Sequence, residues 1–251
     1  MFIKNFMKKE KKGKILKFLE KKINNTSLSN NQKKNFIFTA DIIINLIVIV
    51  ALVLFIRTFL ISPFQVFGVS MCNTFNYHNE RCIDSFGDYI IINKSAYLEL
   101  PGYTVGKPER GDVIVFHPPQ NPNQFYIKRI IGLPEETIKL IDGDVYLINE
   151  EHPTGIKLEE PYLSNENRGK TFALDEISEF DIPSGKYLVL GDNRTKSSDS
   201  RSCFKDSFGA PGCDNAEITP YLSINNIEGK AAIVLWPNPR IIYSHDYQEI
   251  K

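Results

Sequence analysis

A long apolar run that follows a basic N-terminal segment constrains this chain more than any other feature. Residues 1–34 contain 11 Lys and two Glu, a net charge of +9, although the whole 251-residue chain is neutral. Between Ile42 and Ile56 the only polar residue is Asn45. A helix needs about 20 apolar residues to cross the hydrocarbon core of a bilayer, and residues 36–61 supply them. No polar face interrupts the run, which argues against a buried helix of a soluble protein.

A cleavable signal peptide is the main alternative to a membrane anchor. Its apolar core would span roughly 7–15 residues and end at a small-x-small cleavage site. The run is longer, and residues 57–64 (RTFLISPF) contain no such site. We therefore expect an uncleaved, single-pass anchor in the plasma membrane, with the basic tail 1–35 in the cytoplasm and residues 62–251 outside it. Within residues 2–22, a basic surface helix and a solvated tail both remain open.

The four cysteines all lie on the expected outer side of the membrane, where disulfides persist. They form two pairs of equal spacing in the sequence, although four cysteines allow three connectivities. The simplest pairing is Cys72–Cys82 and Cys203–Cys213. A zinc site is less expected, because the sequence has no C-x-x-C motif and no histidine beside either pair.

The sequence after residue 62 changes to short β-rich runs bounded by Gly, Pro, Asn and Asp. We expect a mainly β catalytic domain of antiparallel sheets, in which residues 149–183 and 202–224 are insertions. Residues 35–251 carry 19 basic and 28 acidic side chains, and this acidic balance argues against a nucleic-acid partner. Asp142-Gly143 predicts a hairpin turn. The expected strands are Tyr89–Asn93, Asp112–Phe116, Phe125–Ile131, Thr137–Ile141, Val145–Ile148, Tyr187–Leu190 and Ala231–Trp236.

One of these expected strands, residues 125–131, is strongly apolar but contains two cations. Alternation along a strand puts Tyr126, Lys128 and Ile130 on one face and Arg129 on the other. One cation must therefore face a largely apolar surface. The strand could be a solvated edge with protective charges. The other interpretation is a buried lysine whose lowered pKa lets its amine take a proton from a serine hydroxyl.

Two further stretches contain residue types that carry chemistry. Residues 64–75 follow the apolar run at once and contain Ser70, which we therefore expect near the bilayer surface. Residues 191–201 form a dense polar turn after an apolar strand. Asp, Asn and Ser side chains can satisfy the backbone groups of a loop. The turn is either a surface loop or a rigid polar shelf that holds neighbouring residues in place.

Taken in order, these motifs resemble those of type I signal peptidases (leader peptidases), a family of membrane-bound Ser–Lys endopeptidases. The resemblance covers most of residues 42–201 and the late strand Gly229–Trp236. It implies an antiparallel β catalytic domain anchored by one N-terminal transmembrane helix. The matching motifs are residues 68–74 (GVSMCNT), 110–116 (RGDVIVF), 126–134 (YIKRIIGLP) and 191–201 (GDNRTKSSDSR).

The resemblance also implies roles for particular residues. Ser70 would be the nucleophile and Lys128 the general base, and the backbone N–H of Ser70 would donate to the oxyanion. No metal or organic cofactor would be required. The supporting residues would be Ser197, which orients the lysine amine, and the ion pairs Asp199–Arg201 and Asp192–Arg129.

The implied substrates are the signal peptides of exported preproteins, with small residues at the first and third positions before the cut. Such a chain would bind extended along strand edges, so that main-chain hydrogen bonds supply much of its affinity. Its partners are then preproteins and the lipid bilayer. The positions that match the shallow apolar pockets are Phe64, Val66, Gly68, Met71, Tyr126 and Ile127.

The sequence departs from the family pattern at three places. Gly68 stands where many relatives have a serine that assists the oxyanion, so the second donor is not identified. Asn73 replaces a usual proline, and residues 202–224 replace a shorter segment. Two other functions remain as alternatives: a different Ser–Lys peptidase, and a catalytically silent β domain that is tethered to the membrane and binds exported chains.

Overall fold

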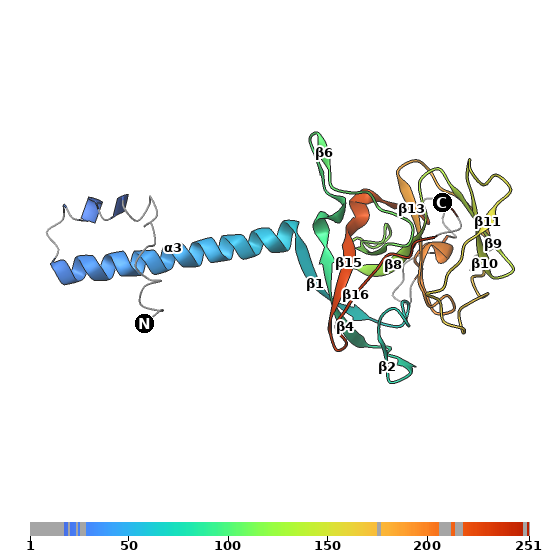
Figure 1. Ribbon diagram of the computed structural model, residues 1–251, viewed down its shortest axis with the longest axis horizontal. Helices are drawn as coiled ribbons and strands as arrows, with labels where there is room; N and C mark the ends of the chain where they lie inside the picture. The colour runs from blue at the N-terminus through green and yellow to red at the C-terminus, as the bar shows by residue number, and fades with distance from the viewer. Residues whose placement is uncertain are drawn as a thin grey trace. The chain divides into compact units, whose positions relative to one another are not determined.

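The chain divides into two compact units, Met1–Thr58 and Phe59–Lys251, in a computed structural model (Figure 1). The first unit contains one long helix, and the second contains the β-strands and every predicted site residue. The structure describes residues 18–19, 21–23, 25, 29–174, 177–205, 212–213, 218–247 and 250.

Helix α3 (Asn30–Phe59) is long and apolar enough to cross a membrane, with a mean hydropathy of 2.8 over its most apolar stretch. It begins six residues before the predicted span because a capping box starts it. The Ser29 N–H donates to Gln32 Oε1 at 3.0 Å, and the Gln32 N–H donates to Ser29 Oγ at 3.4 Å. The helix ends at Phe59, two residues before the predicted limit.

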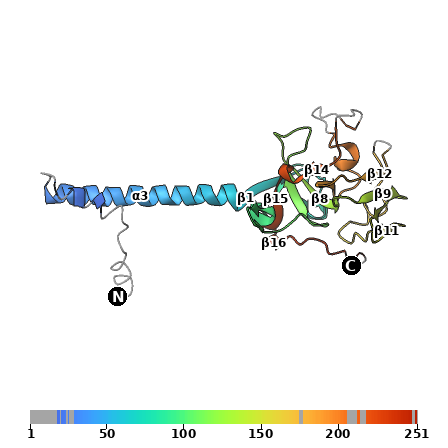
Figure 2. The same ribbon diagram turned by 90° about the horizontal axis from the view of Figure 1, so that it is seen from above.

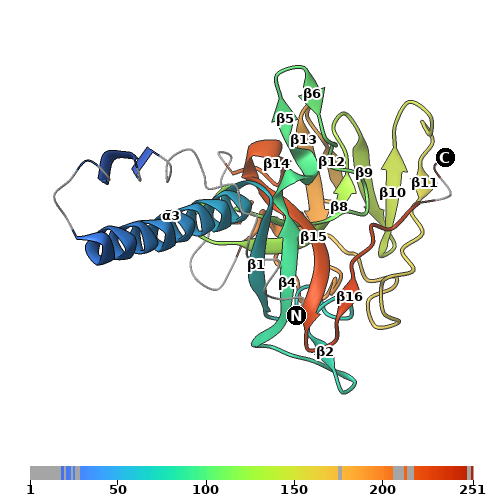
Figure 3. The ribbon, with the colours of Figure 1, turned by 60° about the vertical axis from the view of Figure 1, so that its left-hand side comes forward.

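The largest sheet is antiparallel and has the strand order β1-β4-β15-β7-β8-β13-β14, with β16 paired to β15. Figure 3 shows β1, β4 and β15 side by side. Among the residues that the structure describes, β1 pairs with β4 alone, which makes it an edge strand of this sheet. The strands are β1 (Ile61–Phe67), β4 (Phe86–Asn93), β7 (Val113–Phe116), β8 (Tyr126–Gly132), β13 (Lys186–Leu190), β14 (Leu222–Ser223), β15 (Ile227–Trp236) and β16 (Arg240–Ile241).

A second, four-stranded sheet has the order β11-β10-β9-β12 and lies at the end of the β unit away from β1 (Figure 2). The predicted turn at Asp142-Gly143 joins β9 to β10, and both residues have positive φ. The insertion 149–183 is more regular than predicted, because it supplies β11 and β12. The bounds are β9 (Thr137–Ile141), β10 (Asp144–Ile148), β11 (Ile156–Lys157) and β12 (Glu179–Asp181), with two small hairpins, β2 (Tyr77–His78) with β3 (Arg81–Cys82) and β5 (Glu99–Leu100) with β6 (Tyr103–Thr104).

Buried apolar side chains form three clusters, one of which joins the two sheets. This cluster includes Ile138 of β9, Phe180 of β12 and Leu188 of β13. At Gly132 of β8, an added Cβ would meet Ile182 Cδ1 at 2.2 Å and Ile138 Cγ1 of β9 at 2.9 Å. The second sheet therefore packs directly against the strand that contains Lys128.

All seven predicted strands overlap observed strands, and both simplest disulfides are present. β1 was not predicted, because its sequence continues the apolar run and contains Pro63. Proline cannot donate a ladder hydrogen bond and is tolerated on an edge strand, which is what β1 is.

Candidate active site

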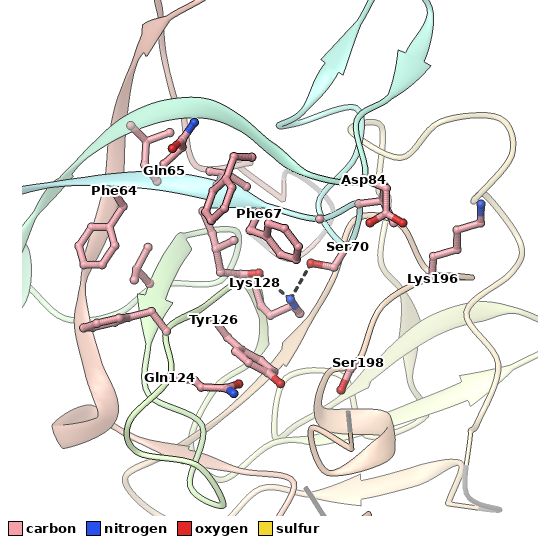
Figure 4. A pocket seen from close by; sticks show the side chains of 18 residues that line it. Phe64, Gln65, Phe67, Ser70, Asp84, Gln124, Tyr126, Lys128, Lys196 and Ser198 are labelled. Atoms are coloured by element: carbon pink, nitrogen blue, oxygen red, sulfur yellow. Dashed lines mark hydrogen bonds between the residues drawn. The ribbon is translucent and has the colours of Figure 1, made fainter. Parts of the chain in front are cut away.

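Ser70 and Lys128 are 58 residues apart in the sequence but in contact in the structure. Lys128 Nζ lies 2.8 Å from Ser70 Oγ and also 2.8 Å from the backbone oxygen of Ile127 (Figure 4). Ser70 lies in the turn that follows β1, while Lys128 extends from β8. A hydroxyl and an amine at this distance are within the reach needed for proton transfer.

The Lys128 side chain is only 4% exposed. Burial lowers the pKa of its amine from 10.5 to about 8, even though the carboxylates of Asp199 and Asp192 act in the opposite direction. The cause is desolvation, which penalises the ammonium form. About a tenth of the amine is therefore neutral at pH 7 and about half at pH 8, and a neutral amine can accept a proton.

Arg129 lies on the opposite face of β8 and is also buried, so β8 is not a solvated edge. Its guanidinium makes two hydrogen bonds to Asp192, of 3.0 and 2.7 Å, and one of 2.8 Å to the Gly111 oxygen. The Thr74 hydroxyl donates to the same Asp192 carboxylate at 2.5 Å. Tyr162, from the insertion, places its ring 3.9 Å from this guanidinium. The network ties β8 to the loop that contains Ser70.

We predict that Asp192→Asn lowers the free energy of unfolding by about 3–5 kcal/mol, because it leaves the buried Arg129 charge without its partner. Denaturant unfolding of the full chain in detergent measures this loss. Asp144→Asn is the matched control, since the Asp144–Lys157 pair is partly exposed and is expected to contribute less than about 1 kcal/mol. Equal losses in the two variants would contradict the role of burial.

Asp199 and Arg201 form a second buried ion pair, with guanidinium–carboxylate distances of 2.9 and 2.8 Å. Burial alone would raise the pKa of Asp199, but Arg201 and the Gly191 N–H keep it below its usual value. Ser197 is buried beside this pair, and an added Cβ on Gly191 would come within 2.0 Å of its hydroxyl oxygen.

We expected Ser197 to hydrogen-bond to the Lys128 amine. Among the residues that the structure describes, these two side chains form no such bond. Two oxygens, Ser70 Oγ and the Ile127 carbonyl oxygen, already lie within hydrogen-bond distance of the amine. Within the described residues, Ser197 is therefore buried near the site but makes no hydrogen bond to Lys128.

The polar turn also holds the backbone of the serine loop, which sequence reasoning missed. The backbone N–H of Asn193 donates to the backbone carbonyl oxygen of Ser70 at 3.0 Å, and the Asn193 side-chain amide donates to the backbone oxygen of Val69 at 3.1 Å. On the other side, the Asn76 amide donates to the Gly68 oxygen at 2.9 Å. Asparagine is common in such turns, but that preference alone does not reveal which loop it will hold.

Asn73 explains one departure from the family pattern. Its φ is 79°, in the left-handed region, which Asn tolerates and which proline, with φ fixed near −65°, cannot adopt. The disulfide Cys72–Cys82 closes the same loop and joins the buried Cys72 to the exposed β3.

We predict that the double variant C72A/C82S loses about 2–3 kcal/mol of stability, the value expected for a cross-link between residues ten apart. Its cleavage activity should fall as well, because this loop carries Ser70. The matched control is C203A/C213S, which opens a loop of the same length elsewhere in the sequence. Full activity in C72A/C82S would contradict a positioning role for the first disulfide.

A cavity of about 720 Å³ opens over the Ser70–Lys128 pair. Its walls include five of the six predicted substrate positions; the exception is Met71, which is 1% exposed and packs into the core. Its sulfur accepts a hydrogen bond from the Asp192 N–H at 3.4 Å, so it supports the site from below. The predicted residues in the wall are Phe64, Val66, Gly68, Tyr126 and Ile127.

Two strand edges without a neighbouring strand line this cavity. β1 is the edge strand of the sheet, and the Tyr126–Lys128 part of β8 pairs with β7 on one side only, because pairing with β13 begins at Arg129. An extended peptide could therefore lie between them as an added strand. Among the described residues, no three His, Cys, Asp or Glu side chains are grouped to hold a metal ion.

An antiparallel β domain in which a serine hydroxyl contacts a buried lysine amine has the geometry expected of a Ser–Lys serine peptidase. A family model described as "Signal peptidase, peptidase S26" matches residues 39–236. The chain belongs to this signal peptidase family.

Two relatives of known name, from Pseudomonas aeruginosa and Bacillus licheniformis, support the same assignment. Signal peptidase I of Pseudomonas aeruginosa is 32% identical over 218 residues, which cover 76% of this chain and 70% of that protein. Signal peptidase I of Bacillus licheniformis is 34% identical over 182 residues, covering 70% of this chain and 84% of that protein. A crystal structure of a signal peptidase I from Enterococcus faecalis V583 is 30% identical, covers 49% of this chain and 96% of its own, and superimposes with a TM-score of 0.34.

Proposed function

We propose that Ser70 is the nucleophile and Lys128 the general base in the removal of signal peptides from exported preproteins. The observation that carries this proposal is the 2.8 Å contact between Ser70 Oγ and the buried Lys128 amine. The proposal rests on the family assignment for the substrate and on this geometry for the chemistry.

The reaction runs in two stages. Neutral Lys128 accepts the Ser70 proton as Oγ attacks the peptide carbonyl, and the Ser70 N–H donates to the oxyanion. The lysine ammonium then protonates the leaving amine, which frees the mature chain and leaves an acyl-enzyme. Lys128, neutral again, activates a water that releases the signal peptide and restores the serine. In each stage Lys128 carries the proton that is transferred, Ser70 carries the acyl group between the stages, and water finally takes the acyl group.

The cavity wall supports a substrate with small apolar residues before the cut. An extended chain between β1 and β8 would place alternate side chains against Phe64, Val66 and Ile127. The apolar character of these walls favours apolar over charged side chains at those positions of the substrate.

Cleavage of a preprotein by the full chain in detergent tests this function. We expect a single cut after a small residue, located by mass spectrometry of the released mature chain. The matched control is the same preprotein with Phe at the position before the cut, which should be cleaved at least about tenfold more slowly. Binding of both preproteins without cleavage would favour the silent β domain instead, and equal cleavage of both would contradict the substrate class.

We also propose that α3 spans the plasma membrane once, with the basic tail in the cytoplasm and the β domain outside. The Lys-rich flank supports this orientation, and the acidic balance of the domain argues against a nucleic-acid partner. Protease added to intact cells should degrade the β domain and spare a tag at the N-terminus. Degradation of the tag while the β domain is protected would show the opposite orientation and contradict this proposal.

A further inference from the structure

The cavity over Ser70 has two chemically different ends. Around β1 and β8 its walls are mainly apolar and aromatic. The wall also includes Asp84, Lys196 and Ser198, and Figure 4 shows Asp84 and Lys196 on the side of Ser70 away from Phe64. The reaction chemistry described so far uses none of these three polar residues.

The polar end lies where the leaving segment of a substrate would pass. The two open strand edges occupy the apolar side, and they offer the main-chain groups that would hold the residues before the cut. A chain held there brings its scissile carbonyl to Ser70 and then continues toward Asp84 and Lys196. This direction rests on the proposed function, in which the apolar signal peptide forms the acyl part.

Lys196 is held at this end by its backbone while its side chain is exposed. The backbone N–H of Lys196 donates to the backbone oxygen of Asn193 at 3.0 Å, and the backbone N–H of Asn193 donates to the backbone oxygen of Ser70 at 3.0 Å. Two consecutive hydrogen bonds therefore fix the position of Lys196 relative to the nucleophile. Within the part of the chain that the structure describes, no carboxylate lies within 4.0 Å of its amine.

Asp84 contributes the opposite charge from the loop before β4. Its Oδ1 lies 3.9 Å from the point that a Cβ on Gly68 would occupy, so it stands beside the serine loop. In the described residues it too has no ion-pair partner. A carboxylate here repels an acidic substrate side chain, whereas the Lys196 ammonium attracts it.

We propose that Lys196 is a specificity-determining residue that binds an acidic side chain among the first residues after the cut, and that Asp84 weakens this preference. The ligand is thus a carboxylate of the mature chain, which leaves as the acyl-enzyme forms. An ion pair between exposed groups contributes modestly, so the expected preference for Glu over Gln is about two- to fivefold in kcat/KM at low salt. Raising the salt concentration should reduce it.

The test uses peptides that share all residues before the cut and carry Glu or Gln at the first, second or third position after it. Full-length wild type in detergent should prefer Glu at one of these positions. At that position K196Q should cleave the two peptides equally, K196E should prefer Gln, and D84N should increase the Glu preference. K139Q is the matched control, because Lys139 lies on β9 in the other sheet, and it should keep the wild-type ratio.

Because each ratio compares two peptides with one variant, a general loss of activity does not alter it. The inference is overturned if wild type shows no preference for Glu at any position, or if K196Q keeps the wild-type ratio. If wild type cleaves none of the peptides, that result contradicts the proposed function, and this inference, which rests on the proposed function, is overturned with it.

Discussion

Replacing Ser70 with alanine should reduce kcat/KM for a preprotein by roughly 10⁴-fold or more, since no other group can form the acyl-enzyme. Lys128→Met should cause a loss of the same order, because methionine fills similar apolar space but cannot accept the serine proton. The two losses should not add in the double variant, since both residues act in the same step. Cleavage of a preprotein followed on gels over several hours measures all three.

Two control variants separate this loss from misfolding. Ser178→Ala replaces an exposed serine outside the cavity wall, and Lys139→Met replaces a lysine on β9. Both should keep activity within about twofold. The unfolding midpoint of the Ser70 variant should stay near that of wild type, because Ser70 is not part of a buried ion pair in the described chain. The midpoint of Lys128→Met should be equal to or above that of wild type, because the lowered pKa of Lys128 means that burying its amine costs stability. Substantial cleavage by either active-site variant would end the Ser–Lys assignment.

The rate should also fall steeply on acidification. The folded protein holds the pKa of Lys128 at about 8, below the 10.5 of a free lysine, and the active form is the neutral amine. Lowering the pH through 8 protonates the base, so kcat/KM should fall about tenfold per pH unit well below that value. A pH series on a peptide substrate that carries no ionisable group near the cut measures the acid limb.

The matched control for this profile is Asp144→Asn, which changes a partly exposed charge in the second sheet and should leave the acid limb in place. A profile that is flat down to pH 5, or an acid limb near pH 4, would indicate a carboxylate base and contradict the account.

Local patterns predicted the strands and the character of β8, but not how distant segments meet. Alternation placed Lys128 and Arg129 on opposite faces, and both proved buried, because β8 is covered on both sides. The contact between Ser70 and Lys128 joins the turn after β1 to β8, and no local pattern in the sequence encodes it. The sequence predicts this contact only through the order in which the family motifs occur.

Other features depend on contacts between segments far apart. Met71 was expected in a substrate pocket but lies in the core, because the turn after Gly68 directs it inward against Asp192. Tyr162 stacks on Arg129 from an insertion that looked irregular in sequence. Asn193 binds the serine loop through its amide and its backbone. Each of these arrangements is set by tertiary packing rather than by residue preference.

The protonation state of the Lys128 amine is the central claim, and NMR titration measures it directly. Lysine labelled with ¹³C at Cε gives one signal per residue, and the signal that disappears in Lys128→Met belongs to Lys128. The account predicts that this signal titrates near pH 8, well below the 10.5 of a free lysine. Titration at or above pH 10.5 would mean that the amine is charged at working pH and cannot be the base.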